Sequence, residues 1–174
     1  IVPAIYFKIK EDALYKNRLM MLDIVSENNW KRPIYFTGGS FGDDDYLWMK
    51  DYLQLDGMCY KLVPVKTKSG KDGPNPMEMG YIDTEKMYNI VTKWDWGNSG
   101  NPAMYHDPET RKNGISYRTN MARLMEALLN EGQDAKAEKI IALAMEKMPI
   151  NYFDYYTLVE PFAQGYYELG KKNK

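Results

Sequence analysis

The chain has almost none of the residue types that build disulfides or metal centres. It contains one cysteine, Cys59, and one histidine, His106. A single thiol excludes a disulfide within the chain and a cluster of thiolate ligands, and a single imidazole excludes a site with several histidine ligands. Cys59 lies in the apolar run 58–65, so we expect it to be a small buried hydrophobe.

The chain also lacks a charge excess and a long apolar run. Its formal net charge is −1, so no basic field favours nucleic acid or an anionic membrane surface as a partner. No apolar run approaches the roughly 20 residues of a membrane helix, and no signal peptide opens the chain. The chain starts at Ile1 without methionine. We therefore expect a domain cut from a larger protein, and a proteolytically processed product is the alternative.

The first half alternates predicted helices with short predicted strands. Apolar residues at helical spacing predict a helix over 12–29, with Asp12 as its N-cap, and a second helix over 43–53. The aromatic and β-branched run 33–37 predicts a buried strand. A further strand is predicted over 57–66, at an edge of the sheet because a proline stands near its end.

The remaining segments predict an α+β, mostly helical protein. Residues 66–80 have loop composition, 83–94 read as a helix, and 96–114 read as an irregular connection. Everything after this connection has a helical pattern. We therefore predict a small α/β subdomain over 1–114, with a few short strands, packed on a helical subdomain over 115–174.

The second half carries the clearest pattern, a helical hairpin. Gly132 between the two helices predicts a left-handed C-cap, and Pro149 is expected to end the second helix. Apolar residues recur at helical spacing on both helices: Met121, Leu124, Met125 and Leu128, then Ala137, Ile140, Ile141, Ala144 and Met148. The segment resembles one tetratricopeptide repeat of about 34 residues, and 156–170 resembles the first helix of a second repeat. A generic helical hairpin is the alternative.

Such a repeat predicts a binding surface. Exposed residues of its first helix line the concave side of a repeat array and contact an extended peptide. The candidate binding residues are Thr119, Arg123, Glu126 and Asn130, with Tyr155 and Tyr156 on the next helix. Trp94 and Trp96 form a separate pair that would stack on a glycan ring or, alternatively, pin a loop against the core. We expect a protein or peptide partner, with a glycan as the weaker possibility.

Motifs for catalysis are absent or incomplete. The glycine-rich segment 38–42 follows a predicted strand, but its spacing fits no dinucleotide or P-loop pattern, and the aspartates 43–45 behind it would repel a phosphate. Those aspartates are consecutive, whereas a calcium loop needs alternate ligands. His106 has no serine or cysteine nucleophile motif beside it. We therefore predict no catalytic residue, no cofactor and no metal site.

Several short motifs resemble one protein family. They are NNWKRPIYF (28–36), DYLQLDG (51–57), YKLVP (60–64), YRT (117–119) and the repeat over 124–149, and RPIYF (32–36) is the most specific. They are similar to the uncharacterised Bacteroidetes-type family of multi-spanning membrane proteins that look like protein O-mannosyltransferases. The resemblance spans about 12–170. It implies the soluble C-terminal region of such a protein on the periplasmic face of the inner membrane, tethered through preceding membrane helices.

The resemblance gives our first functional hypothesis. In that family the presumed glycosyl-transfer site belongs to the membrane part, so this chain is expected to be a non-catalytic accessory domain that holds a polypeptide substrate or a partner. The alternative is a free-standing tetratricopeptide-type scaffold for protein interactions. A carbohydrate-binding module that uses Trp94, Trp96 and the tyrosines is the weaker alternative.

Overall fold

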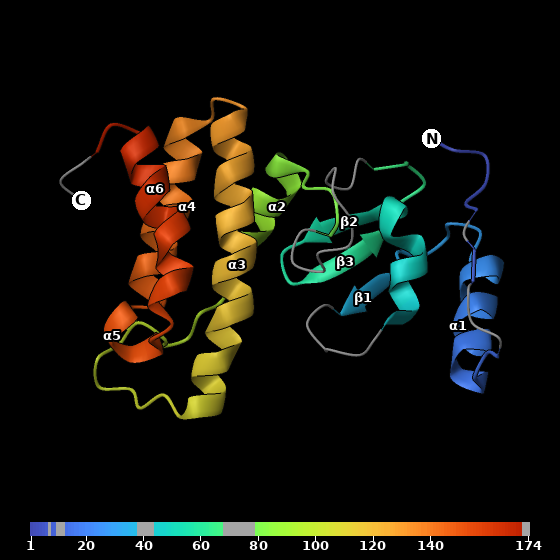
Figure 1. Ribbon diagram of the computed structural model, residues 1–174, viewed down its shortest axis with the longest axis horizontal. Coiled ribbons are helices and arrows are strands. Elements are labelled where there is room, and N and C mark those ends of the chain that lie inside the picture. Colours follow the sequence, from blue (N-terminus) through green and yellow to red (C-terminus); the bar gives the residue numbers. More distant parts are fainter. Residues whose placement is uncertain (7, 10–12, 38–43, 68–78, 172–174) are drawn as a thin grey trace. The chain divides into compact units, whose positions relative to one another are not determined.

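The computed structural model describes residues 1–6, 8–9, 13–37, 44–67 and 79–171. Its fold is α+β and mostly helical, which confirms the predicted class (Figure 1). The chain divides into two compact units, Ile1–Tyr81 and Ile82–Lys174. The sequence places the boundary after residue 114, whereas the structure groups helix α2 (Thr84–Val91) with the helical unit. Helix α2 belongs with the helical unit because it packs on the following helix and shares hydrogen bonds and an ion pair with that unit.

The described residues of the first unit include an α-helix and a 3₁₀ helix. Helix α1 spans Lys16–Glu27, inside the predicted range 12–29, and begins after Tyr15 without a side-chain cap; the predicted cap Asp12 lies outside the described residues. The second predicted helix takes the tighter 3₁₀ form, η1 (Asp44–Tyr52). The glycine segment 38–42, Asp43 and the side chains of the next two aspartates also lie outside the described residues.

The first unit holds a three-stranded antiparallel sheet. Its strands are β1 (Tyr35–Thr37), β2 (Leu53–Asp56) and β3 (Cys59–Leu62), in the order β1-β3-β2. The prediction of 57–66 as an edge strand is therefore wrong, because β3 is central. Pro64 lies beyond the last paired residue, Leu62, so its missing N–H removes no ladder hydrogen bond.

Two further sequence expectations on the sheet are wrong. The strand predicted as buried, β1, exposes Tyr35 and Thr37 and half-buries Phe36; it lies at the edge of the sheet and has one paired neighbour. Cys59 is half-buried rather than buried. Strand β2 was not predicted at all, since its first residue was assigned to the preceding helix.

The core of the first unit is formed mainly by residues of η1, β2 and β3. Its buried apolar residues are Met49, Tyr52, Leu53, Leu55, Tyr60, Leu62 and Met79. The edge of β2 that is not paired with β3 bonds to the backbone of Tyr81. The N–H of Tyr81 donates to the carbonyl of Leu53 (2.9 Å), and its carbonyl accepts from the N–H of Leu55 (2.7 Å). These bonds satisfy backbone groups that an edge strand would leave open.

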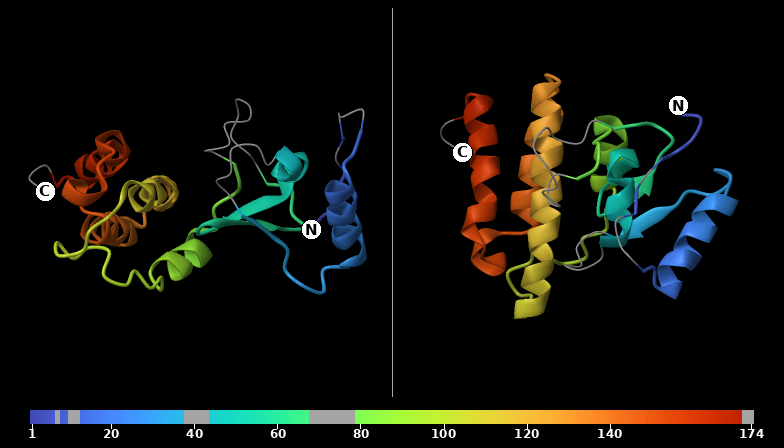
Figure 2. Two further views of the ribbon diagram at one scale, coloured as in Figure 1. Left: turned by 90° about the horizontal axis from the view of Figure 1, so that it is seen from below. Right: turned by 45° about the vertical axis from the view of Figure 1, so that its right-hand side comes forward.

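The second unit is built from helices, with an irregular connection over 92–107 between the first two of them. After α2 come α3 (Pro108–Asn130), α4 (Asp134–Lys147), the short α5 (Ile150–Phe153), the 3₁₀ helix η3 (Tyr156–Val159) and α6 (Glu160–Glu168). Helices α3, α4 and α6 pack side by side (Figure 2). Helix α3 begins inside the predicted irregular connection 96–114, because Asp107 caps it and Pro108 suits its first position.

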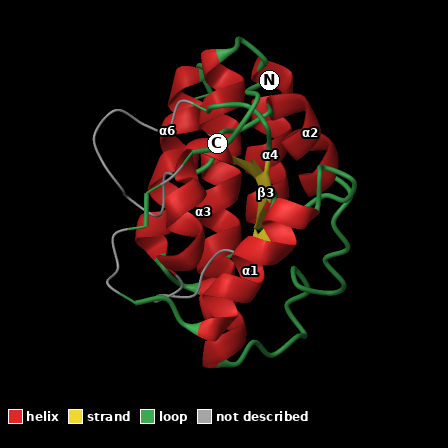
Figure 3. Ribbon diagram, turned by 90° about the vertical axis from the view of Figure 1, so that its right-hand side faces the viewer, coloured by secondary structure: helices red, strands yellow, loops and turns green. Residues whose placement is uncertain are grey.

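The predicted hairpin is confirmed in its core and its turn. All nine apolar residues named for its two helices are buried. Gly132 has φ +70°, which is the left-handed C-cap conformation that glycine adopts without a Cβ penalty. Helix α6 approaches closely at Gly165, where a Cβ would overlap the sulfur of Met125. Helix dominates the view coloured by secondary structure (Figure 3).

Among the residues that the structure describes, none of the helices combines the length and apolar character needed to cross a membrane.

Candidate functional site

The four predicted binding residues of α3 share one face of that helix. Thr119, Arg123, Glu126 and Asn130 fall within a narrow arc at about 100° per residue, opposite the buried side that carries Leu124 and Leu128. Glu126 and Asn130 are exposed, and Thr119 and Arg123 are half-buried. The exposed part of this face therefore lies toward the C-terminal end of α3.

The two predicted tyrosines lie at a turn rather than together on a helix. Tyr155 precedes η3, and Tyr156 is its first residue. Tyr155 is 37% exposed and Tyr156 is 67% exposed. Asp154 and Tyr155 both have positive φ, at 54° and 53°, a region that costs strain for residues other than glycine. We call residues 153–156 the tyrosine turn.

A buried arginine holds the tyrosine turn in place. Arg118 of α3 is 1% exposed; its Nη1 donates to the carbonyl of Asp154 (2.5 Å) and its Nη2 to the carbonyl of Met148 (2.7 Å). Its guanidinium also lies 5.9 Å from the ring centroid of Phe153. Burial lowers the pKa of Arg118, and the nearby Asp154 opposes that shift. Guanidinium groups remain charged even so, so these bonds are charge-assisted.

A second arginine of α3 contacts the same turn. Arg111 Nη1 forms an ion pair with Asp154 Oδ2 at 2.5 Å, and both side chains are partly exposed. The start of α3 is fixed by Asp107, whose carboxylate accepts from the N–H groups of Glu109 and Thr110. The hydroxyl of Thr110 also donates to it and, with these backbone bonds, lowers the pKa of Asp107. Two arginines of α3, Arg111 and Arg118, therefore hold the tyrosine turn.

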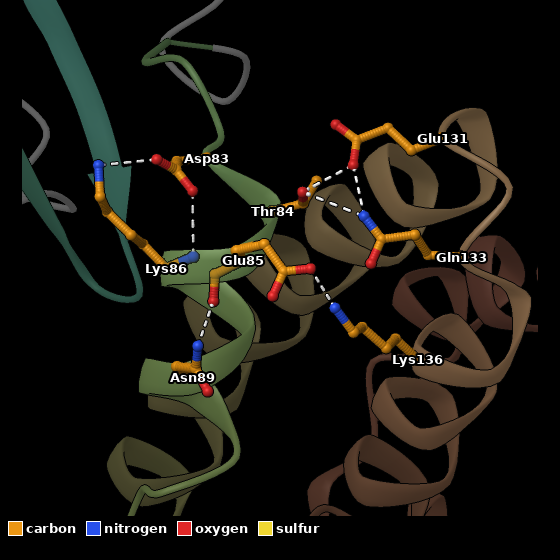
Figure 4. A network of polar contacts seen from close by, with 8 residues as sticks. All are labelled: Asp83, Thr84, Glu85, Lys86, Asn89, Glu131, Gln133 and Lys136. Atoms are coloured by element: carbon orange, nitrogen blue, oxygen red, sulfur yellow. Dashed lines mark hydrogen bonds and ion pairs between the residues drawn. The ribbon is translucent and has the colours of Figure 1, made fainter.

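The opposite end of α3 is tied to α2 by a polar network (Figure 4). Glu131 Oε2 accepts from the hydroxyl of Thr84 (2.7 Å) and from the side-chain amide of Gln133 (2.7 Å). Glu85 of α2 also forms an ion pair with Lys136 of α4. Together with the burial of Met87 and Val91 of α2, these contacts join α2 to the hairpin.

The cap of α2 is Asp83. Its carboxylate accepts from the N–H of Lys86 (3.1 Å) and pairs with the ammonium of Lys86 (2.7 Å). Burial raises the pKa of Asp83, but the two hydrogen bonds from Lys86 and its charge outweigh burial and hold the pKa below its ordinary value. The cap is therefore ionised at neutral pH.

Trp94 and Trp96 pack against each other and against Tyr117 of α3. The two indole centroids are 5.4 Å apart at an interplanar angle of 69°, and Trp94 meets Tyr117 at 5.2 Å and 83°. Both indoles are half-buried, and the indole N–H of Trp96 is enclosed without a hydrogen-bond partner in the described structure. This edge-to-face cluster is the arrangement expected of residues that fix a loop to a helix.

His106 has structural neighbours. Its Nε2 lies 2.9 Å from the carbonyl oxygen of Ser99, and its ring centroid lies 4.5 Å from that of Phe153, at an interplanar angle of 42°. The hydroxyl of Ser99 in turn donates to the carbonyl of Lys147 (2.8 Å). Within the described ranges, no group of three or more His, Cys, Asp or Glu side chains is placed to hold a metal ion.

Sequence reasoning missed Arg111, Arg118 and Asp154 as supports of the site. Arginine is rarely buried, so the spacing of apolar residues on α3 does not predict a core position for Arg118. One usable signal was Asp107-Pro108, which marks a helix start and places both arginines on α3. The sequence does not indicate the positive φ of Asp154 and Tyr155, because aspartate adopts that conformation only occasionally and tyrosine is not typical of it.

The first part of the chain matches a known family model. Residues 1–86 match a family model described as TMEM260-associated domain 2. The match covers the first unit and the start of α2, and it links this part of the chain to a domain associated with a membrane protein family. No curated protein and no solved structure matches the chain.

Proposed function

We propose that this chain is a non-catalytic accessory domain of a glycosyltransferase-like membrane protein, and that its helical unit binds an extended polypeptide on the periplasmic side. The match of residues 1–86 to a TMEM260-associated domain supports the link to a membrane protein. It agrees with the motifs RPIYF and DYLQLDG, which resemble a family that looks like O-mannosyltransferases. A polypeptide is the acceptor that a protein-glycosylating enzyme needs to hold.

Two surfaces of the helical unit carry the proposal of peptide binding: the α3 face, whose exposed part lies toward the C-terminal end of that helix, and the tyrosine turn, which is held by the N-terminal half of α3. Arg123, Glu126 and Asn130 offer a cation, an anion and an amide for the polar groups of an extended chain. Tyr155 and Tyr156 offer rigid, exposed rings with hydroxyl groups, the residue type enriched at binding surfaces. The hairpin pattern resembles tetratricopeptide repeats, which use the corresponding helix face.

The fixed geometry of the turn supports the same proposal. The bonds from Arg118 and the ion pair from Arg111 hold Asp154 in place. They maintain two residues at positive φ, a conformation that costs energy unless the surrounding structure enforces it. Rings held in one position lose less freedom on binding than rings on a loose loop, which favours affinity.

A peptide array tests this function directly. Extended 15-residue peptides are titrated as fluorescent conjugates against the full chain, and the best binder is then titrated against the double variant Arg123→Ala/Glu126→Ala. We expect at least tenfold weaker binding for this variant. The matched control is Glu146→Ala/Lys147→Ala, which removes an exposed ion pair of α4 with the same net charge change.

Two results would contradict the proposal. One is an array without a saturable binder. The other is equal affinity of the parent chain and the Arg123→Ala/Glu126→Ala variant. A free-standing scaffold would bind a peptide in the same way; fractionation of the native host cells distinguishes it from a membrane-tethered domain.

A further inference from the structure

The first unit contains an apolar cavity beside α1. It has a volume of about 430 Å³, which is within the range of about 300–1,000 Å³ for ligand pockets. Residues of α1, of the N-terminal segment and of the sheet region enclose it: Val2, Pro3, Ala4, Ile5, Ile9, Leu22, Val25, Ser26, Asn28, Asn29, Trp30, Ile34, Met49 and Leu62. Most of these side chains are apolar, so the cavity favours an apolar ligand.

Helix α1 is underpacked at this cavity. It has no buried residue, although its sequence carries six large apolar residues. Leu22 and Val25 face the cavity and are only half-buried. A helix with apolar residues around most of its circumference is normally covered, and apolar side chains that border empty space lose dispersion contacts. An apolar ligand in the cavity would supply those contacts.

The polar side chains of the cavity wall favour a hydrocarbon over a peptide. Among the described residues that line the cavity, none is charged. The hydroxyl of Ser26 donates to the carbonyl of Asp23 (2.9 Å), and the amide of Asn28 donates to the carbonyl of Arg32 (2.8 Å). The side chains of Ser26 and Asn28, two of the three polar residues that positions 26–29 contribute to the cavity wall, are therefore already engaged. A peptide brings N–H and C=O groups that need partners when buried, whereas an aliphatic chain needs none.

The residues that follow the cavity wall carry positive charge. Asn29 and Trp30 both have positive φ, at 46° and 58°, and they turn the chain beside the cavity, where Trp30 is 52% exposed. The next two residues, Lys31 and Arg32, are exposed cations. The acids of α1, Asp23 and Glu27, are exposed on the side of the helix away from Val25. The charge near the cavity therefore suits an anionic head group, even though the whole chain has no basic excess.

We propose that this cavity binds the aliphatic chain of an anionic amphiphile, with Trp30 beside the chain and the head group near Lys31 and Arg32. A free fatty acid and an anionic phospholipid share this chemistry. The proposal concerns the first unit and is independent of peptide binding by α3, because the two sites have no residue in common.

The test is fluorescence quenching by a brominated fatty acid. The full chain is titrated with 12-bromododecanoate below its critical micelle concentration, with dodecanoate as the unbrominated control. We expect saturable quenching by the brominated acid, and loss of most of this quenching in the Trp30→Phe variant. Flotation with phosphatidylglycerol vesicles distinguishes the two sources of the ligand. If the protein floats with the vesicles, it takes a phospholipid from a bilayer. If it stays behind, it takes a monomeric fatty acid.

Variants that fill the cavity make the test specific. Val25→Phe adds volume inside the cavity, and we expect at least tenfold weaker binding of 12-bromododecanoate. Leu19→Phe is the matched control on the same helix, because Leu19 is exposed and does not line the cavity; its binding should equal that of the parent. If Val25→Phe fails to fold by circular dichroism, Ala4→Phe fills the cavity from the N-terminal segment. Unsaturable quenching, or parental affinity in a folded filling variant, would overturn the proposal.

Discussion

Arg118 Nη1 donates a hydrogen bond of 2.5 Å to the backbone carbonyl of Asp154. This bond joins the middle of α3 to the turn that carries Tyr155 and Tyr156. The same guanidinium bonds the carbonyl of Met148 at the end of α4, so one buried side chain fixes both ends of the short α5. The exposed tyrosines thus depend on a residue that is not itself exposed.

Replacing Arg118 with leucine should destabilise the helical unit. The substitution leaves the carbonyls of Met148 and Asp154 without their donor, and a lost charge-assisted pair of bonds to buried carbonyls costs about 2–4 kcal/mol. Urea unfolding followed by far-ultraviolet circular dichroism measures the change. Chymotrypsin, which cleaves after aromatic residues, should also cut faster at Tyr155 and Tyr156. Unchanged stability and an unchanged cleavage rate would show that Arg118 does not hold the turn.

Replacing Tyr155 with asparagine should separate stability from binding. Asparagine adopts positive φ more readily than tyrosine, so relief of strain should raise the free energy of unfolding by about 0.5–1 kcal/mol. Peptide binding should fall, because an exposed ring is lost. Thermal unfolding and peptide titration measure the two effects. A clear loss of stability would indicate that the Tyr155 ring packs more than its exposure implies.

The cap of α2 should contribute a pH-dependent part of stability. Asp83→Ala removes the hydrogen bond to the N–H of Lys86 and should cost about 1 kcal/mol at pH 7. Because the pKa of Asp83 in the folded state is below its ordinary value of 3.8, its carboxylate stabilises the fold fully above that value. The contribution disappears as the pH falls through the folded-state pKa.

Asp83→Asn is the matched control for this prediction. Asparagine caps helices about as well as aspartate but has no carboxylate to titrate. The difference in unfolding free energy between the parent chain and Asp83→Asn should therefore shrink between pH 5 and pH 2.5. A difference that stays constant over this range would contradict a charged contribution from Asp83.

The loop before α3 should tolerate no side chain at Gly100. A Cβ there would overlap the carbonyl oxygen of Glu146, and a backbone atom cannot rotate away as a flexible side chain does. Gly100→Ala should therefore destabilise the helical unit by about 1–3 kcal/mol. Asn101→Ala is the control, because Asn101 is an exposed neighbour in the same loop; it should cost less, through loss of its side-chain bond to the N–H of Ala103. Equal stability of Gly100→Ala and the parent would show that the loop moves freely.

The hairpin was predictable because its signals are local. Apolar spacing on α3 and α4 depends on residues that lie within a few turns of each other, and Gly132 marks the turn by its own backbone preference. The class of the protein followed from the same patterns. These predictions needed no knowledge of contacts between distant segments.

The sheet order and the supports of the tyrosine turn depend on distant contacts instead. Strand β3 is central because β1 and β2 pair on its two sides, which the residues around Pro64 alone do not indicate. Arg118 is buried because the carbonyls of Met148 and Asp154, 30 and 36 positions away, accept its hydrogen bonds. Local composition predicts an exposed arginine at that position. The candidate residues themselves were named from the sequence, but their fixed geometry was not.

The most direct test of the proposed function is an immunoblot of fractionated native host cells with an antibody against this chain. If the chain is a periplasmic domain of a membrane protein, the antibody should detect a band far larger than 20.3 kDa in the membrane fraction. Protease added from the periplasmic side should remove the epitope. A soluble band near 20.3 kDa, or an epitope protected from that protease, would contradict the account and leave a free-standing scaffold in its place.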